Sequence, residues 1–212
     1  MRGRRAKRSE MYRKFGKRIL DIVLSGLLIP VILPFFGILS LWIKLDSEGP
    51  VLFRQTRFGI HQTKFEILKF RTMYRDAPHD VPTHLFREPE RWVTRAGRAL
   101  RRASLDELPQ IFQIFTGKMS IVGPRPALWN ETDLVKEREA VGANDVLPGL
   151  TGLAQINGRD ILSRAEKVRY DGIYAQNVSL KMDLMCLWKT VKVVFSGRGN
   201  RDVEQKNGGK RA

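Results

Sequence analysis

Residues 19–43 read ILDIVLSGLLIPVILPFFGILSLWI, an apolar run in which Asp21 is the only charged side chain. As a straight helix this run would be about 37 Å long at ~1.5 Å per residue, which is enough to cross the hydrocarbon core of a bilayer. Pro30 and Pro34 lie near its middle. Because each proline removes a helix hydrogen bond and bends the helix axis, the run predicts a membrane helix that bends halfway.

The charges on either side of the run help to choose between a cleaved signal peptide, a spanning helix and a re-entrant helix. Residues 1–18 carry nine Lys or Arg against the single acid Glu10, and basic residues return from Lys44 onward. Basic residues mark the cytoplasmic side of a membrane segment, so neither flank looks exported. No small-residue cleavage site follows the run, which disfavours a signal peptide. We expect a re-entrant helix at residues 19–47, with a spanning helix as the alternative and Asp21 near the membrane interface.

Length and composition predict one folded domain in addition to this helix. The chain has 212 residues, enough for a single domain with an appendage. We expect a basic arm at 1–18, the domain at 48–197 and a disordered basic tail at 198–212. The net charge of +16 indicates an anionic partner, which leaves nucleic acid, anionic lipid or a phosphorylated small molecule. The single cysteine, Cys186, excludes an intramolecular disulfide and fits a reducing compartment.

Two segments after the apolar run predict strands. Residues 51–58 (VLFRQTRF) and 64–73 (KFEILKFRTM) are rich in β-branched and aromatic residues and flank a short stretch that begins with glycine. This pattern is typical of a hairpin or a pair of short strands. Its outward positions are basic and include Lys69 and Arg71.

Three further segments predict helices. A basic helix is expected at 92–103 and an apolar-faced helix at 105–115. Apolar residues recur at helical spacing over 184–195, opposite lysines, so this helix either packs on the core or lies in a membrane interface. The predicted fold class is therefore α+β: a re-entrant membrane helix, a small hairpin or sheet, and a mainly helical domain with amphipathic interfacial helices.

A pair of carboxylates, Asp106 and Glu107, lies where the second of these helices should begin. Ser104 followed by Glu107 fits a capping box, in which both side chains satisfy free backbone N–H groups. Pro109 is tolerated only in the first turn, so the helix should start close to residues 104–106. The alternative interpretation is a nucleophile and its neighbour at a helix end that favours negative charge.

Arginines in rigid settings give weight to the second interpretation. Arg125 lies in GPRP, Arg159 follows the Asn-Gly turn, and Arg101 immediately precedes the carboxylate segment. Guanidinium groups make paired, charge-assisted hydrogen bonds to phosphate oxygens. With a carboxylate nucleophile and a hard cation such as Mg²⁺, this set suits transfer of a phosphate-containing group. The sequence has neither a GxxxxGK[ST] phosphate loop nor a GxGxxG fingerprint.

Several motifs resemble, in order, those of the bacterial sugar transferase family, the monotopic polyprenyl-phosphate phosphoglycosyl transferases. The resemblance is to the small, minimal members of the family and covers the chain from residue 17 to about residue 195. The motifs that carry it are KRILDIVLSG, GPVLFRQTRFG, FEILKFRTM, SLDELPQ, MSIVGPRP, LPGLTGLAQINGR and YDGIYAQN. It implies that Asp106 attacks a UDP-sugar, releases UMP and holds the phosphosugar covalently until polyprenyl (undecaprenyl) phosphate accepts it. It further implies that Glu107 is a base or a positioner, that Asp106 binds Mg²⁺, and that phosphate and nucleotide are contacted by Lys69, Arg71, Arg101, Arg125 and Arg159.

The resemblance also implies a place for the reaction. The enzyme would lie at the cytoplasmic face of the inner membrane, in contact with the bilayer, and start glycoconjugate or exopolysaccharide synthesis. Small members often have Ser-Pro at the bend, where this chain has Leu33-Pro34. A membrane-anchored nucleic-acid-binding protein or a scaffold would leave Asp106 and Glu107 unexplained, so we expect no nucleic-acid partner. The sugar and the oligomeric state, a homodimer included, stay open.

Overall fold

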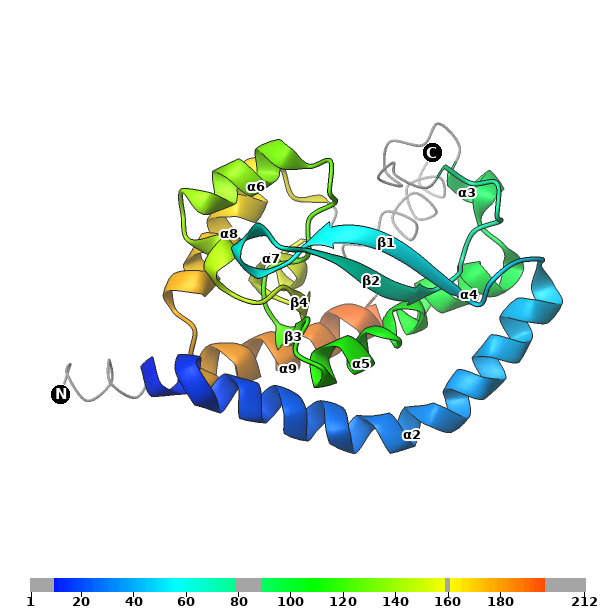
Figure 1. The fold of residues 1–212 in the computed structure, drawn as a ribbon, viewed down its shortest axis with the longest axis horizontal. Coiled ribbons are helices and arrows are strands. Elements are labelled where there is room, and N and C mark those ends of the chain that lie inside the picture. Colours follow the sequence, from blue (N-terminus) through cyan, green and yellow to red (C-terminus); the bar gives the residue numbers. More distant parts are fainter. Residues whose placement is uncertain (1–9, 79–88, 159–160, 197–212) are drawn as a thin grey trace.

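The computed structural model describes residues 10–78, 89–158 and 161–196. One long helix, α2, runs beneath a body of shorter helices and two two-stranded sheets (Figure 1). Helices and short sheets in one body are the α+β class that the sequence predicts. Half of the predicted basic arm and all of the predicted tail lie outside the described residues.

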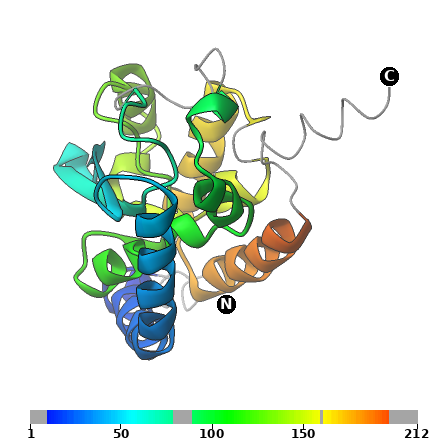
Figure 2. The same ribbon diagram turned by 90° about the vertical axis from the view of Figure 1, so that its right-hand side faces the viewer.

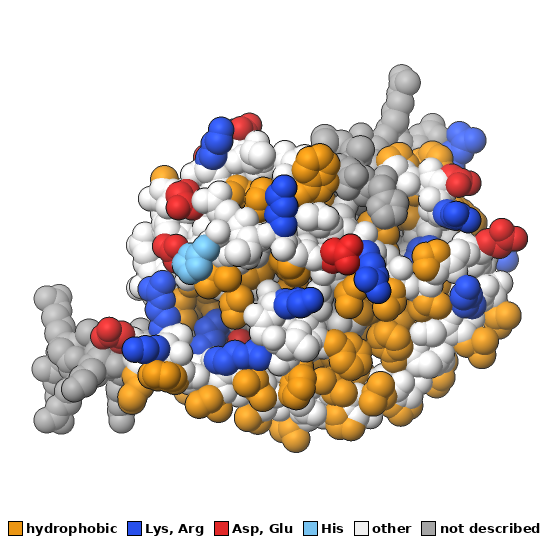
Figure 3. Space-filling model, viewed as in Figure 1, with side chains coloured by type: hydrophobic (Ala, Val, Ile, Leu, Met, Phe, Trp, Pro, Cys, Tyr) orange, Lys and Arg blue, Asp and Glu red, His pale blue; other side chains and the backbone are white. Residues whose placement is uncertain are grey.

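Helix α2 spans Lys17–Asp46 and continues directly from a π-helical turn at Tyr12–Gly16. Pro30 and Pro34 lie inside it, and the helix curves near its middle without being interrupted (Figure 1). Within Tyr12–Asp46 an 18-residue window has a mean hydropathy of 2.6 and is only 6% buried, unlike a helix from the core of a soluble protein. Hydrophobic side chains line the lower edge of the molecule over α2 (Figure 3).

Polar side chains join the first part of α2 to the body. The buried carboxylate of Asp21 accepts hydrogen bonds from the Ser120 hydroxyl at 2.8 Å and from the Ile121 N–H at 2.9 Å. Lys17 forms a buried ion pair of 2.8 Å with Asp183. The Asp21 carboxylate satisfies buried donors at the start of a strand, where water does not reach. The expected position of Asp21 near a membrane interface stays a prediction.

The far end of α2 is tied to the same body. Asp46 accepts a hydrogen bond of 3.0 Å from the Ala96 N–H in the first turn of α4, Arg95–Arg102. Arg71 donates to the Ser47 carbonyl at 2.7 Å, just beyond the helix end. The outward orientation expected for Arg71 is wrong, because only 5% of the residue is exposed and it serves the helix terminus.

The predicted hairpin is confirmed. Strands β1, Leu52–Phe58, and β2, Lys64–Phe70, pair antiparallel from Leu52↔Phe70 to Phe58↔Lys64. One side chain of helix α5, Gln110–Phe115, forms hydrogen bonds to the backbone of β2. Gln113 accepts from the Leu68 N–H at 2.9 Å and donates to the Glu66 carbonyl at 2.6 Å. These two bonds fix α5 beside β2.

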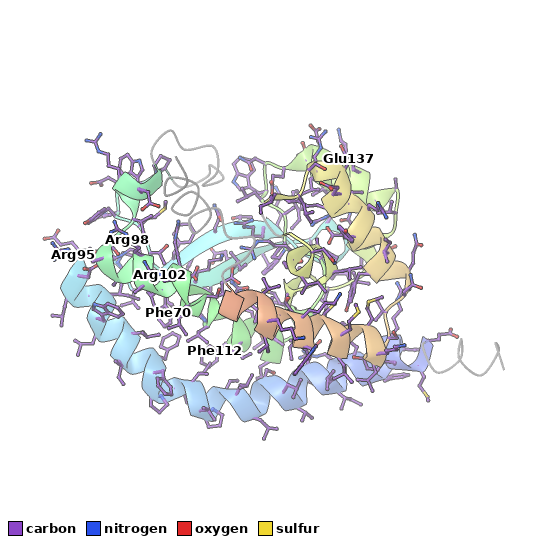
Figure 4. The ribbon with its side chains drawn as sticks, turned by 180° about the vertical axis from the view of Figure 1, so that it is seen from behind. Phe70, Arg95, Arg98, Arg102, Phe112 and Glu137 are labelled. Atoms are coloured by element: carbon purple, nitrogen blue, oxygen red, sulfur yellow. The ribbon has the colours of Figure 1, made fainter. Side chains whose placement is uncertain are left out.

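Aromatic side chains fill the space between the hairpin, α5 and the second half of α2. The Phe36 ring lies 4.6 Å from that of Phe70 and 5.9 Å from that of Phe112, measured between centroids. Figure 4 shows Phe70 and Phe112 on the side of the body that faces α2. The contacts of α2 thus change along its length, from buried ion pairs and hydrogen bonds to ring packing.

The second sheet pairs two short parallel strands, β3 at Ser120–Val122 and β4 at Gly149–Thr151. Gly123 and Gly152 follow these strands, and their backbones touch so closely that a Cβ on Gly152 would collide with the Gly123 carbonyl oxygen. Only glycine permits this approach. Both strands therefore deliver the following loops to one edge of the sheet.

Short helices surround the sheets. Helix α9, Leu180–Ser196, packs on the core through the buried Asp183 and Cys186 and exposes Leu184 and Trp188. The alternative that α9 lies in a membrane interface stays a prediction. In the side view α9 extends away from α2 (Figure 2). The remaining bounds are α3 Pro89–Trp92, α6 Thr132–Glu139, α7 Leu153–Ile156 and α8 Arg164–Gln176.

Candidate active site

The two carboxylates lie on a single 3-10 turn, Leu105–Glu107, and not on the helix itself. Ser104 precedes the turn with a left-handed backbone, φ 56°, and its side chain makes no capping bond. Helix α5 begins only at Gln110, with Pro109 in the N-cap position. The predicted capping box and helix start are therefore wrong, because Glu107 reaches cationic partners instead of the backbone. The real capping box joins Ser163 and Glu166 at the start of α8.

Glu107 is held by two cations that come from other elements. Its Oε1 accepts hydrogen bonds from Lys69 Nζ on β2 at 2.8 Å and from Arg125 Nη2, after β3, at 3.0 Å. Only 14% of the Glu107 side chain and 17% of the Lys69 side chain are exposed. The largely desolvated Lys69–Glu107 pair interacts more strongly than a surface ion pair, whereas the Arg125 side chain is 43% exposed. The site is therefore assembled from the hairpin, the 3-10 turn and the loop after β3.

These surroundings shift the pKa values of the two neighbouring carboxylates in opposite directions. Burial raises the pKa of Asp106, against the nearby charge of Lys69. Burial alone would also raise the pKa of Glu107, but the charges and hydrogen bonds of Lys69 and Arg125 outweigh it and hold that pKa well below its usual range. Glu107 is therefore ionised at neutral pH and a weak proton acceptor.

Asp106 has a different environment from its neighbour. Within the described part of the chain its half-buried carboxylate has no hydrogen bond or ion pair, although the positive charges of Lys69 and Arg101 lie close enough to lower its pKa. Arg101 is itself oriented by a 2.9 Å bond from its Nε to Thr72 Oγ1. A carboxylate that has cations close by but no bond to any of them is available to a ligand or a reacting atom.

The structure gathers most of the residues that the sequence predicts for the site. Lys69, Arg101 and Arg125 surround Asp106 and Glu107. Arg71 does not join them, because its guanidinium points to the end of α2. Arg159 lies outside the described residues.

One further residue of the surroundings, Arg57 on β1, is not among the predicted site residues. Arg57 lies near Arg125 and Glu107, and burial together with the charge of Arg125 lowers its pKa to about 10. Its Nη1 donates to the Pro126 carbonyl at 3.0 Å. The signal in the sequence was its place in the strand motif, but period-two alternation does not show which strand end meets the arginine loop.

A magnesium ion has a suitable donor here only together with a ligand. Within the described segments no group of three or more His, Cys, Asp or Glu side chains could hold a metal ion. Mg²⁺ sites often use one or two carboxylates plus phosphate oxygens of the substrate. Asp106 offers one such carboxylate, whereas one oxygen of Glu107 already accepts bonds from two cations. The donor set therefore fits an ion that arrives with a phosphorylated substrate.

An exposed apolar helix attached to the body and a carboxylate pair set among cations form an arrangement that suits a phosphate-bearing ligand near a membrane. Comparison with known proteins identifies the family. The sequence model of one family, described as bacterial sugar transferase, matches residues 12–197. The chain belongs to the bacterial sugar transferase family and is an enzyme of the phosphoglycosyl transferase class, as the motifs predict.

Relatives with known names differ in the sugar. The chain is 42% identical to a UDP-glucose:undecaprenyl-phosphate glucose-1-phosphate transferase of Caulobacter vibrioides, covering 82% of this chain and 68% of that protein. It is 37% identical to the exopolysaccharide production protein ExoY of Rhizobium meliloti, covering 87% and 88%. It is 34% identical to a UDP-N-acetylgalactosamine-undecaprenyl-phosphate N-acetylgalactosaminephosphotransferase of Aeromonas hydrophila, covering 88% and 45%. The chain spans less than half the length of several relatives.

Proposed function

We propose that this enzyme transfers a sugar 1-phosphate from a UDP-sugar to undecaprenyl phosphate and releases UMP, as the first step of glycoconjugate or exopolysaccharide synthesis. The names of its relatives support the substrate classes. The observation that carries the proposal is the contrast within the carboxylate pair. Glu107 is bonded to two cations, while Asp106, next to it, has no such partner in the described part of the chain.

The reaction proceeds in two displacements at one phosphorus atom. An Asp106 carboxylate oxygen attacks the phosphorus that carries the sugar, and the bond from this phosphorus to the bridging oxygen breaks. UMP departs with that electron pair, which leaves an aspartyl-phosphosugar. A phosphate oxygen of undecaprenyl phosphate then attacks the same phosphorus. The bond to Asp106 breaks, the carboxylate is regenerated, and undecaprenyl diphosphate sugar is the product.

The cations and Glu107 have separate roles in this scheme. Lys69 and Arg101 neutralise phosphate oxygens as negative charge builds up in the transition state, whereas Arg125 binds the diphosphate equally in the ground state and the transition state. Glu107 positions Lys69 and Arg125 and is not the general base, since its lowered pKa makes it a weak proton acceptor. Asp106 would hold Mg²⁺ when the nucleotide sugar is bound, and the ion would supply further charge neutralisation.

We further propose that α2 enters the membrane and returns, so that the whole body stays on the cytoplasmic face of the inner membrane. Support comes from the two ends of α2, both of which bind the same body, through Lys17 and Asp46. The exposed apolar face of α9, which includes Leu184 and Trp188, would lie in the interface of the same membrane.

Topology can be tested with single cysteines at positions 5 and 50, because the native Cys186 is buried and reacts poorly with a label. We expect a membrane-impermeant reagent added to intact cells to label neither position and to label both after lysis. Labelling of only one position in intact cells would contradict the re-entrant arrangement.

Activity can be tested on the purified protein with Mg²⁺, undecaprenyl phosphate and a panel of UDP-sugars. We expect UMP release with at least one sugar, and Asp106→Asn to lower its rate by at least about 1,000-fold. The matched control is Asp133→Asn, which changes an exposed carboxylate on α6. Release of UDP in place of UMP, or an active Asp106→Asn variant, would disprove the mechanism. The panel also identifies the sugar.

A further inference from the structure

The loop at residues 124–127, which carries Arg125, is held through its backbone by hydrogen bonds from several sides. Each of its four carbonyl groups accepts a hydrogen bond, and the donors belong to different parts of the molecule. These bonds are Gly149 N–H to Pro124 O at 2.8 Å, Arg138 Nη1 to Arg125 O at 2.9 Å, Arg57 Nη1 to Pro126 O at 3.0 Å, and Phe58 N–H to Ala127 O at 2.9 Å. The loop is therefore fixed in a single conformation before any ligand arrives.

The donor to the Arg125 carbonyl is itself held by a buried carboxylate. Arg138, on α6, directs Nε and Nη2 to Asp171 Oδ2 on α8, at 2.9 and 2.6 Å. Arg138 is 6% exposed and Asp171 is 1% exposed. Burying both charges costs desolvation energy that their mutual attraction repays only in good geometry, so such a pair is weak evidence of a stabilising role. What the pair does achieve is to aim the third donor, Nη1, at the Arg125 carbonyl.

We propose that Arg138, oriented by Asp171, is a positioning residue that holds Arg125 ready for the diphosphate of the nucleotide sugar. The inference rests on the proposed function. Among the described contacts Arg138 touches none of the reacting groups, and it acts through the Arg125 backbone. Fixing that backbone sets the direction in which the long Arg125 side chain leaves the loop. Less conformational freedom is then lost on binding, so the pair between α6 and α8 sets nucleotide affinity.

The test compares two arginines that both join α6 to α8. Arg138→Lys keeps the charge opposite Asp171, but an ammonium lacks the planar fork that serves two partners at once. We expect the dissociation constant for UDP and the KM for the UDP-sugar to rise about tenfold, or ~1.4 kcal/mol, with kcat within about threefold of the wild type. In the control, Arg164→Met removes an exposed arginine that pairs with Asp133 and Glu137 and bonds no loop carbonyl. Its binding and kinetic constants should not change.

The readouts separate a positioning role from a structural one. If Arg138→Lys lowers the melting temperature but binds UDP like the wild type, the proposal is overturned. If this variant does not fold, Asp171→Asn retains the guanidinium, loses the charge that aims it, and must show the same weakened binding. A wild type that binds UDP but releases no UMP would contradict the proposed reaction while leaving the binding comparison decisive. A wild type that does not bind UDP would overturn the inference as well.

Discussion

The loop at residues 124–127 and the 3-10 turn at residues 105–107 face each other across the site, but they are fixed in different ways. The loop is held through its backbone by bonds from distant elements. Backbone bonds at the turn are local, such as Leu108 N–H to Leu105 O at 3.2 Å, and its long-range ties are side-chain contacts of Glu107. Mutations near the loop should therefore act by changing its packing and conformation. Mutations around the turn should act by changing the electrostatics of the site.

The largest effect on stability should follow from adding a side chain at Gly152, where two backbones are in close contact. In Gly152→Ala the new Cβ would collide with the Gly123 carbonyl oxygen and lie 2.9 Å from Gln155 Oε1. We expect a loss of about 3 kcal/mol or more in the free energy of unfolding, measured by denaturant titration. Gly37→Ala on α2 is the control, because its Cβ would meet no atom within 4 Å. Equal stability of the two variants would contradict the tight packing.

The next effect concerns charge at the turn. Lys69→Met removes one of the two cations bound to Glu107 and leaves a largely buried carboxylate with less compensation. We expect UMP release to fall about 100-fold, as for loss of one donor that stabilises developing charge. Arg54→Met on the paired strand is the control, since Arg54 is exposed and forms only a 3.4 Å pair with Glu66. Similar losses in both variants would show that general positive charge, and not this contact, matters.

Glu107→Gln should shift the pH dependence of the residual activity. The Glu107 charge raises the pKa of Asp106 and also raises that of Lys69. Its removal lowers both pKa values. Activity needs an ionised Asp106 and a protonated Lys69, so both limbs of the kcat/KM profile should move to lower pH. In Glu90→Gln, an exposed control, the profile should not move. Limbs that stay in place in Glu107→Gln would refute the electrostatic coupling.

The smallest effect distinguishes two serines that both fit capping patterns. Ser104 is left-handed and makes no cap bond, so Ser104→Gly should stabilise the protein by about 1 kcal/mol, or about 2–4 °C in melting temperature. Ser163 accepts a real capping bond from Glu166 N at 3.3 Å, so Ser163→Gly should destabilise by a few tenths of a kcal/mol, about the usual N-cap value. Shifts of the same sign would contradict the two assigned conformations.

Local patterns in the sequence were enough to predict the hairpin and the bend in α2, because these depend on periodicity and on proline. The grouping of Lys69 and Arg125 with the carboxylates was implied by the family resemblance and not by local patterns. The same local rules misplaced the cap, because SLDE and SRAE both satisfy the pattern. Only the second has a backbone in the right conformation and a glutamate with no stronger partner.

Features that depend on distant partners were not predictable in this way. The buried partners of Asp21, Ser120 and Ile121, lie 99 and 100 residues away and could not be foreseen from its neighbours in the sequence. Arg138 gave no signal at all, since its role depends on packing α6 against α8 beneath the loop. Sequence patterns report which chemistry is present, while long-range packing decides which groups meet.

The Lys17–Asp183 ion pair joins positions 166 residues apart, and this separation constrains the order of events during protein synthesis. The apolar helix leaves the ribosome first, while the partners of Lys17 and Asp21 have not yet been translated. Until β3 and α9 exist, both charges need water, so the first turns of the helix stay outside the hydrocarbon while its bent middle enters. On the proposed topology, maturation ends when α9 docks onto a helix that is already in the membrane.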